Sequence, residues 1–260
     1  MADASHAVVA RRWPGGASDR PPFVFVHGAG GDASRFAALG DLIPGSLAID
    51  LPGHGLAGGP ALDRIDGPGG YAAVVEALLE REGLAGVILA GHSMGGAIAL
   101  AVALRGRVRL GGLGLIGTGA RLRVHPDFLA AAAAGEAPAP MPGLMFGPEA
   151  PPELVAAERA ELGSAAASGA LDKDLRACDG FDASQGLGSL TLPAAVIVGS
   201  ADRMTPPRLS EALVRGWGAG GAIVATLVDG AGHYVHRERP EAVAGALRDL
   251  RLRVTGEAAR

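Results

Sequence analysis

The chain has 260 residues, of which 48% are hydrophobic and 19% are charged, and its formal net charge is −4. This length suits one large α/β domain with a substantial core, and the composition is neither that of a disordered chain nor that of a membrane-spanning one. The small negative charge without a block of like charges argues against a nucleic acid or an anionic membrane as partner. Cys178 is the only cysteine, which excludes an intrachain disulfide and a thiolate metal cluster and predicts an ordinary buried or half-buried thiol.

The segment 1–16 contains the Arg11-Arg12 pair but no continuous apolar stretch. A secretory signal needs an apolar stretch after its basic residues, and so does a twin-arginine signal. We therefore expect a cytoplasmic protein.

Short runs of consecutive apolar residues recur along the chain, as expected for strands that are buried on both faces of a parallel sheet. In chain order they are Phe23–Val26, Leu47–Ile49, Gly86–Ala90, Leu110–Ile116, Ala194–Val198 and Ala222–Val228, the fourth and the last being weaker. Segments with helical spacing lie between or after them, namely Tyr71–Glu82, Gly95–Arg105, Pro207–Val214 and Pro240–Leu250. The alternation predicts an α/β protein with a mostly parallel, doubly wound sheet.

The alternation stops between residues 119 and 190. A polyalanine helix, a Pro/Gly-rich stretch and a second helical piece follow one another there without a clear strand, at Phe128–Ala134, Ala137–Pro152 and Glu153–Leu162. Long insertions in a compact domain are usually lids over binding sites or flexible segments, and the apolar Leu144-Met145-Phe146 favours a lid. We therefore predict a core of residues 1–118 and 191–260 and an inserted helical cap of residues 119–190.

The segment Gly91-His92-Ser93-Met94-Gly95 follows the apolar run Gly86–Ala90 and opens a predicted helix. This is the G-x-S-x-G pattern of a nucleophile elbow, in which small residues allow a strained turn that exposes the serine. A glycine-rich helix start with an incidental serine is the alternative, but the position directly after a strand favours catalysis. We predict Ser93 as the nucleophile.

A serine hydroxyl needs a general base within hydrogen-bond reach, and the base needs a carboxylate that fixes its tautomer. Along a chain with a nucleophile elbow, the acid follows the serine and the histidine comes last. Asp202 follows the run Ala194–Val198, and His233 follows the last apolar run, each in a loop of small residues. We predict Asp202 as the acid and His233 as the base, with Asp229 and His236 as weaker alternatives.

The glycine-rich segment His27–Gly31 follows the first predicted strand. Acyl transfer needs N–H donors for the oxyanion, and a loop at this position and the residue after the nucleophile usually supply them. We predict the backbone amides of Ala29 and Met94 as the two donors. Dinucleotide binding is the alternative for such a segment, but the G-x-G-x-x-G spacing is not met.

Five motifs stand in one order along the chain: His27-Gly28, Asp50–Gly55, Gly91–Gly96, Gly199–Asp202 and Gly230–His233. With them the chain resembles the α/β-hydrolase superfamily, in the branch that holds small esterases, enol-lactonases, cofactor-free haloperoxidases and carbon–carbon hydrolases. The resemblance spans nearly the whole chain except the cap. It implies the α/β-hydrolase fold and a structural role for Asp50–Gly55. No cluster of His, Asp and Glu has metal-ligand spacing, and the expected mechanism needs no cofactor. Similar proteins that displace halide or open epoxides have an aspartate at the elbow, and dienelactone hydrolases have a cysteine. The serine of this chain therefore argues against those reactions.

We therefore expect a serine hydrolase that cleaves a small-molecule carboxylic ester or lactone through an acyl-enzyme on Ser93. Arg121 and Arg123 at the cap entry, together with the cap residues Met145 and Phe146, are candidate substrate contacts, although such arginines are more often solvated. Two alternatives remain, a carbon–carbon hydrolase acting on a diketone and a slow ligand sensor that keeps the same triad. The sequence does not indicate the natural substrate or the oligomeric state.

Overall fold

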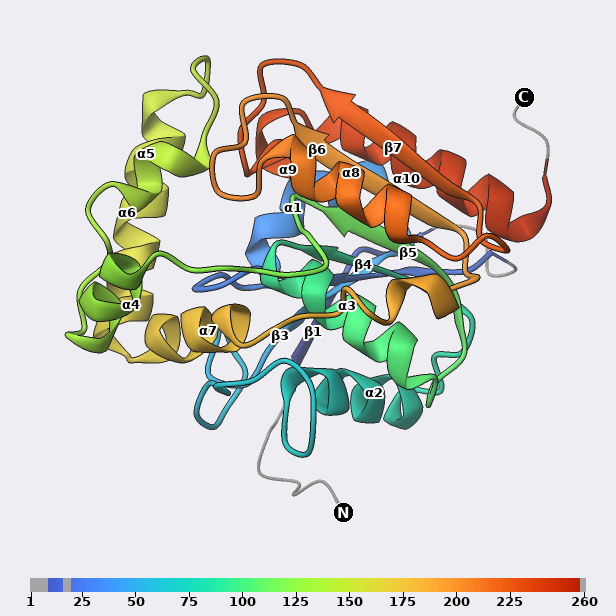
Figure 1. Cartoon of the computed structure of the whole chain (residues 1–260), viewed down its shortest axis with the longest axis horizontal. Helices are drawn as coiled ribbons and strands as arrows, with labels where there is room; N and C mark the ends of the chain where they lie inside the picture. Colours follow the sequence, from blue (N-terminus) through green and yellow to red (C-terminus); the bar gives the residue numbers. More distant parts are fainter. Residues whose placement is uncertain (1–8, 16–19, 258–260) are drawn as a thin grey trace.

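A computed structural model describes residues 9–15 and 20–257 of the protein (Figure 1). Its strands are β1 (Val9–Arg12), β2 (Phe23–Val26), β3 (Leu47–Asp50), β4 (Val87–His92), β5 (Leu110–Ile116), β6 (Ala194–Gly199) and β7 (Ile223–Val228). Its α-helices are α1 (Ala37–Leu42), α2 (Tyr71–Arg81), α3 (Met94–Arg105), α4 (Pro126–Ala133), α5 (Met141–Met145), α6 (Pro152–Ala167), α7 (Ala170–Asp179), α8 (Pro207–Gly216), α9 (Val235–Glu238) and α10 (Pro240–Thr255), and two 3₁₀ helices are η1 (Ala33–Phe36) and η2 (Leu187–Ser189). The segment 1–16, in which we expect no secretory signal, lies largely outside the described residues.

The described strands form one sheet of seven strands in the order β1-β3-β2-β4-β5-β6-β7. Only β1 runs antiparallel to its neighbour, and the other pairs are parallel. The predicted mostly parallel sheet and the α/β-hydrolase fold are therefore confirmed. Because β4 lies in the middle of the sheet, the residue that follows it stands at the centre of the edge formed by the carboxyl ends of the strands, where open α/β sheets bind ligands.

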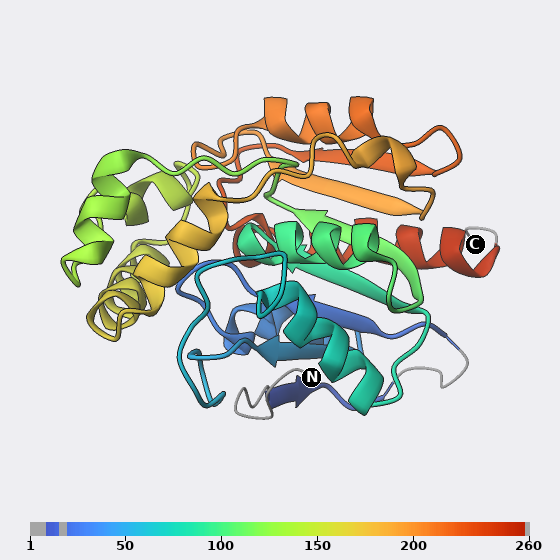
Figure 2. The ribbon, with the colours of Figure 1, turned by 60° about the horizontal axis from the view of Figure 1, so that its bottom comes forward.

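Alternate residues of each central strand face opposite sides of the sheet. Val24 and Val26 of β2 pack in one apolar cluster with residues of α2, α3 and α8. Phe23 and Phe25 of the same strand pack in a second cluster with residues of α1 and α10. Helices therefore cover both faces of the sheet (Figure 2), which explains why these strands are apolar on consecutive residues.

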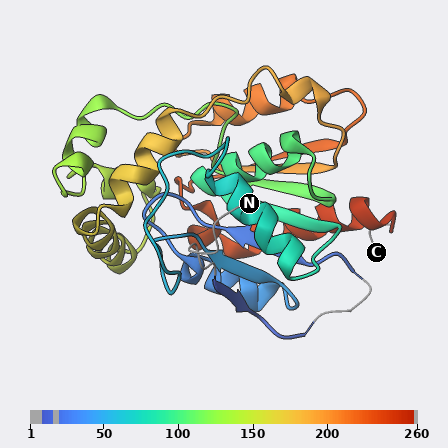
Figure 3. The same ribbon diagram turned by 90° about the horizontal axis from the view of Figure 1, so that it is seen from below.

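Helices α4 to α7 come between β5 and β6 in the chain and stand together beyond one end of the sheet (Figure 3). The two ends of this segment meet at a β-bridge between Arg121 and Asp182, beside a hydrogen bond of 2.7 Å from the Ala183 amide to the Ala120 carbonyl. All four helices fall within residues 119–190, the predicted cap, and these helices with their connecting loops are called the cap from here on. The boundaries of core and cap stay a prediction.

Among the elements that the sequence analysis missed are β1, α1, α5 and α7, and it was wrong about the burial of β7. Val224 is 44% exposed and Leu227 is 61% exposed, because β7 is the edge strand and α10 packs mainly on β5 and β6. None of the helices formed by the described residues combines the length and the apolar character needed to cross a membrane.

Candidate active site

Ser93 occupies a sharp turn between the end of β4 and the start of α3. In the described part of the chain it is the only residue other than glycine with a positive φ, at 52°. The Ser93 amide donates to the Ile116 carbonyl at 2.9 Å, and the Thr118 hydroxyl donates to the Ser93 carbonyl at 2.8 Å. Backbone strain of this kind persists only where the surroundings fix it, and it is common at functional sites.

Glycines around Ser93 allow the turn to pack closely. A methyl group on Gly91 would overlap the Gly95 carbonyl, and one on Gly95 would overlap the Val26 carbonyl. The G-x-S-x-G pattern thus has its expected strand–turn–helix context, and its glycines are required by backbone contacts on both sides of the serine.

His233 and Asp202 form a buried pair at the carboxyl ends of β6 and β7. The Nδ1 atom of His233 lies 2.9 Å from Oδ2 of Asp202, and the two residues are 2% and 3% exposed. Burial favours the neutral acid, but His233 and the hydrogen bonds from Thr205 outweigh it and hold the pKa of Asp202 below its usual value. Asp202 is therefore ionised at neutral pH and fixes the proton of His233 on Nδ1, which leaves Nε2 as the basic nitrogen.

Thr205 completes this pair and was missed by the sequence analysis. Its amide donates to Oδ1 of Asp202 and its hydroxyl to Oδ2, both at 2.8 Å, and the hydroxyl oxygen lies 3.0 Å from His233 Nδ1. A threonine three residues after an aspartate at a strand end is the signal that points to such a turn.

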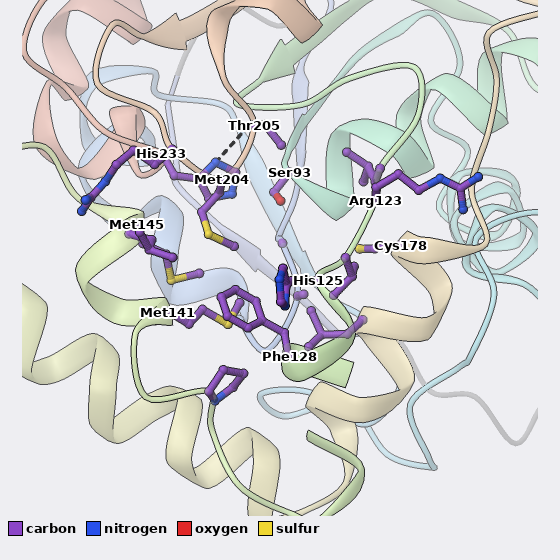
Figure 4. Close-up of a pocket in the computed structure, with 18 of the residues that line it drawn as sticks. Ser93, Arg123, His125, Phe128, Met141, Met145, Cys178, Met204, Thr205 and His233 are labelled. Atoms are coloured by element: carbon purple, nitrogen blue, oxygen red, sulfur yellow. Dashed lines mark hydrogen bonds between the residues drawn. The ribbon is translucent and has the colours of Figure 1, made fainter. Parts of the chain in front are cut away.

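Ser93 and His233 line the same cavity of about 1100 Å³ (Figure 4). Among the described residues the Ser93 hydroxyl makes no hydrogen bond to His233. Contacts of this kind are often long without substrate and shorten when it binds. The predicted nucleophile and the predicted base therefore line one shared space.

The loop after β2 runs directly against the nucleophile. A methyl group on Gly28 would lie 3.2 Å from Cβ of Ser93, and Ala29 lines the cavity. Within the described residues neither the Ala29 amide nor the Met94 amide donates to a protein acceptor. Both amides are thus available to an oxygen bound beside Ser93.

His27 fixes the direction of the Ala29 amide. Its Nε2 accepts from the Leu51 amide at 3.1 Å, so Nδ1 carries the proton and donates to the Gly28 carbonyl at 2.9 Å. Burial, reinforced by the neighbouring His54, lowers the pKa of His27 to about 3 and keeps the ring neutral. Because a trans peptide is planar, holding the Gly28 carbonyl directs the Ala29 N–H the opposite way.

The cavity wall opposite Ser93 comes from the cap and is mostly apolar. Phe128, Met141 and Met145 face the cavity in Figure 4, and further lining residues are Ala131, Pro138, Leu144, Leu175 and Cys178. Cys178 is buried, as predicted. Within the described part of the chain, no three His, Cys, Asp or Glu side chains are grouped to hold a metal ion.

The four predicted substrate contacts lie in different places. Met145 lines the cavity, whereas Phe146 does not and packs against Tyr234 with 5.2 Å between ring centroids. Arg121 and Arg123 border the cavity but form ion pairs with aspartates at 3.3 and 3.8 Å, and both are exposed. Arg123 points away from Ser93 (Figure 4). Of the four, Met145 is therefore the best placed to contact a substrate, and Arg121 and Arg123 lie at the cavity border.

His236 and Asp229, the weaker alternatives for the base and the acid, do not line the cavity. His236 is buried against Phe36 and His92, and burial lowers its pKa well below the usual value. Its ring nitrogens have no hydrogen-bond partner among the described residues. Asp229 accepts a hydrogen bond of 3.1 Å from the exposed Ser200 hydroxyl.

A buried ionic cluster joins cap helix α6 to the core beside the site. Glu158 is fully buried and accepts from the Tyr234 hydroxyl at 2.8 Å, from Arg237 at 2.7 Å and from Arg35. Arg35 also pairs with Glu161 at 2.9 Å. Tyr234, the residue next to His233, is therefore held to α6 by a hydrogen bond to a buried carboxylate.

A sequence model of the Alpha/beta hydrolase family matches residues 23–246. The pimeloyl-[acyl-carrier protein] methyl ester esterase of Neisseria meningitidis is 28% identical over 247 residues, which cover 86% of this chain and 90% of that protein. Relatives of higher identity match only 36% to 38% of this chain, and the chain spans 26% to 38% of their own length.

Solved structures match over nearly the full chain. A thermophilic esterase has a TM-score of 0.82 at 27% identity, and the match covers 98% of this chain and 96% of that one. The enol-lactonase from Burkholderia xenovorans LB400 has a TM-score of 0.81, with coverage of 95% and 97%, but at 22% identity the likeness shows the fold alone. Since the family match spans every strand from β2 to β7 as well as Ser93, Asp202 and His233, the chain belongs to the alpha/beta hydrolase family.

Proposed function

We propose that this hydrolase cleaves a carboxylic ester or lactone, with Ser93 as nucleophile, His233 as general base and Asp202 as the acid that orients it. The observation that carries the proposal is the buried Asp202–His233 pair on the same cavity as the strained Ser93 turn. The similarity to two esterases over most of the chain supports ester substrates.

In the proposed reaction, Nε2 of His233 accepts the hydroxyl proton as Oγ of Ser93 attacks the carbonyl carbon. The amides of Ala29 and Met94 bind the oxyanion. The tetrahedral adduct then collapses, the bond to the leaving oxygen breaks, and the imidazolium gives its proton to that oxygen. A water molecule repeats the sequence on the acyl-enzyme and releases the acid. Asp202 stays ionised throughout.

The cavity lining supports an apolar acyl group as the preferred substrate part. The cap wall offers methionine, leucine, phenylalanine and proline side chains, which gain free energy from burial of hydrocarbon but offer little to polar groups. We expect turnover of p-nitrophenyl esters to favour medium acyl chains over acetate.

Hydrolysis of p-nitrophenyl esters by the wild type and the Ser93→Ala variant tests the proposal. We expect a loss of turnover of about a thousandfold or more in Ser93→Ala, with a fluorophosphonate label on Ser93 in the wild type. The matched control is Ser189→Ala, at an exposed serine remote from the cavity. Turnover near the wild-type level in Ser93→Ala would exclude the proposed nucleophile. A labelled Ser93 without ester turnover would favour a diketone substrate or a slow sensor.

A further inference from the structure

Asp174 is a fully buried carboxylate on cap helix α7, and its side chain contacts three donors from the core. Its Oδ2 accepts from the Gly30 amide at 2.8 Å and lies 2.9 Å from Nε2 of His54. Its Oδ1 accepts from the Tyr71 hydroxyl at 2.6 Å. One cap side chain thus joins the loop after β2, the loop after β3 and the start of α2.

The protons in this cluster can be assigned from the partners. Tyr71 accepts from the Leu62 amide at 2.9 Å, so its own proton points to Asp174. Nδ1 of His54 faces the Pro52 carbonyl at 3.0 Å, and a carbonyl can only accept. His54 therefore donates from both nitrogens and is an imidazolium. Burial opposes this charge, but Asp174 outweighs burial and raises the pKa of His54.

The other charged or titratable groups near this pair are neutral or more distant. His27 lies 4.9 Å from His54, measured between ring centroids, and stays neutral. Burial raises the pKa of the Cys178 thiol, so this group is neutral. Asp32 raises the pKa of His54 through its charge, without a hydrogen bond to the ring. The charge of Asp174 is thus balanced by His54.

At Gly30 the cap contacts the loop after β2, which carries the Ala29 amide. Gly30 follows Ala29 directly, and its carbonyl lies 3.5 Å from a guanidinium nitrogen of Arg35. Its φ is +65°, and a methyl group there would lie 3.2 Å from Leu162 of α6 and from Leu171 of α7. The loop is therefore held at Gly30 by hydrogen bonds and by close packing against two cap helices.

We propose that Asp174 is a positioning residue for the oxyanion hole, which couples the position of cap helix α7 to the direction of the Ala29 amide. One route runs through the Gly30 amide, the residue after Ala29. The other runs through the His54 imidazolium to the Pro52 carbonyl, and from the neighbouring Leu51 amide through His27 to the Gly28 carbonyl. The inference rests on the proposed acyl transfer. It gives His54, in the loop Asp50–Gly55, a part in the reaction without contact to substrate.

The test compares Asp174→Asn with Asp172→Asn, which removes a carboxylate from the same helix where it pairs with the exposed Arg176. Asparagine keeps the shape of the side chain, but its amide nitrogen cannot accept, so a buried donor loses its partner. We expect kcat for p-nitrophenyl octanoate to fall about tenfold to a hundredfold in Asp174→Asn, with KM within about threefold. Asp172→Asn should stay within about twofold of the wild type.

A second readout separates oxyanion positioning from simple loosening of the cap. Octaneboronic acid forms a tetrahedral adduct on a catalytic serine, whereas octanol only fills the apolar cavity. We expect Asp174→Asn to lose boronate affinity by about the same factor as kcat and to bind octanol like the wild type. Equal kcat and boronate affinity in the two variants, or a loss confined to KM and octanol, would overturn the inference.

Tyr71→Phe decides the question if Asp174→Asn does not fold. It removes one donor from Asp174, and we expect a smaller loss, about threefold to tenfold, in kcat and boronate affinity. Unchanged values would overturn the inference. Its failure is distinct from failure of the proposed function, because in the first case the wild type still hydrolyses esters and Ser93→Ala still abolishes turnover.

Discussion

The two walls of the Ser93 cavity are built in different ways. On the core wall, which holds Ala29, Ser93 and His233, hydrogen bonds fix the Gly28 carbonyl and the His233 ring, and burial keeps His92 and His236 behind this wall neutral. On the cap wall, side chains such as Met141 and Met145 contribute volume and hydrocarbon surface. We infer from this difference that the core wall determines the reaction and the cap wall determines which substrate is accepted.

Asp202→Asn tests the core wall and should have the largest effect. An asparagine amide can donate to Nδ1 of His233 and so favours the wrong tautomer, and we expect kcat to fall about a thousandfold or more. Steady-state hydrolysis of p-nitrophenyl butyrate measures the loss. Asp229→Asn, at the exposed aspartate near the end of β7, is the control and should stay within about twofold. Comparable losses in both variants would contradict the assignment of the acid.

Glu158→Gln tests the joint between the walls. Without its charge, Arg237 and the buried Arg35 lose a counterion in the interior, and we expect the free energy of unfolding to fall by about 3 kcal/mol. Urea unfolding followed by circular dichroism measures this. Glu161→Gln removes the half-exposed partner of Arg35 and should cost about 0.5 kcal/mol or less. Similar costs would mean that burial of Glu158 adds nothing to the ion pairs.

Met141→Trp tests the cap wall alone. The larger side chain fills part of the cavity, and we expect kcat/KM for the octanoate ester to fall about tenfold while the acetate ester changes less than about threefold. Met141→Leu conserves volume and serves as the control. A proportional loss on both esters would show that the cap wall also affects the reaction, against the division drawn above.

His54→Gln should have the smallest effect on the free energy of unfolding, and the size of this effect depends on pH. The folded protein raises the pKa of His54 above 6.5, so the charged pair with Asp174 stabilises the fold fully below that pH and loses its effect as the pH rises through the raised pKa. The stability advantage of the wild type over His54→Gln should therefore shrink as the pH rises above about 6.5 and through the raised pKa. Urea unfolding at several pH values measures it, and an advantage that grows with pH would contradict the imidazolium assignment.

The sequence predicted the central sheet well because those strands bury both faces and carry unbroken apolar runs. Phe23–Val26 and Leu110–Ile116 match strands residue for residue. The charged helix α7 and the edge strand β1 carry no such pattern and were missed. Val224 and Leu227 of β7 show the opposite error, since an apolar run at a sheet edge is only partly covered.

The candidate site was predictable where the signal is local. Ser93, Asp202 and His233 each follow a strand in a loop of small residues, and the structure brings all three to one edge of the sheet. Asp174 had no local signal, because its partners lie 103 to 144 positions away in the chain. Side chains that act through long-range contacts cannot be assigned from periodicity or motif spacing.

The bridge between Arg121 and Asp182 has a consequence for protein engineering. Since this bridge holds the two ends of the helical segment side by side, we expect a chimaera that exchanges residues 122–181 for the cap of another hydrolase to keep β5 and β6 in register. Such a transplant would have to supply buried carboxylates in place of Glu158, which pairs with Arg35, and Asp174, which pairs with His54. Otherwise Arg35 would remain in the recipient core as a buried cation without its carboxylate partners, and His54 would lose the carboxylate that keeps it charged.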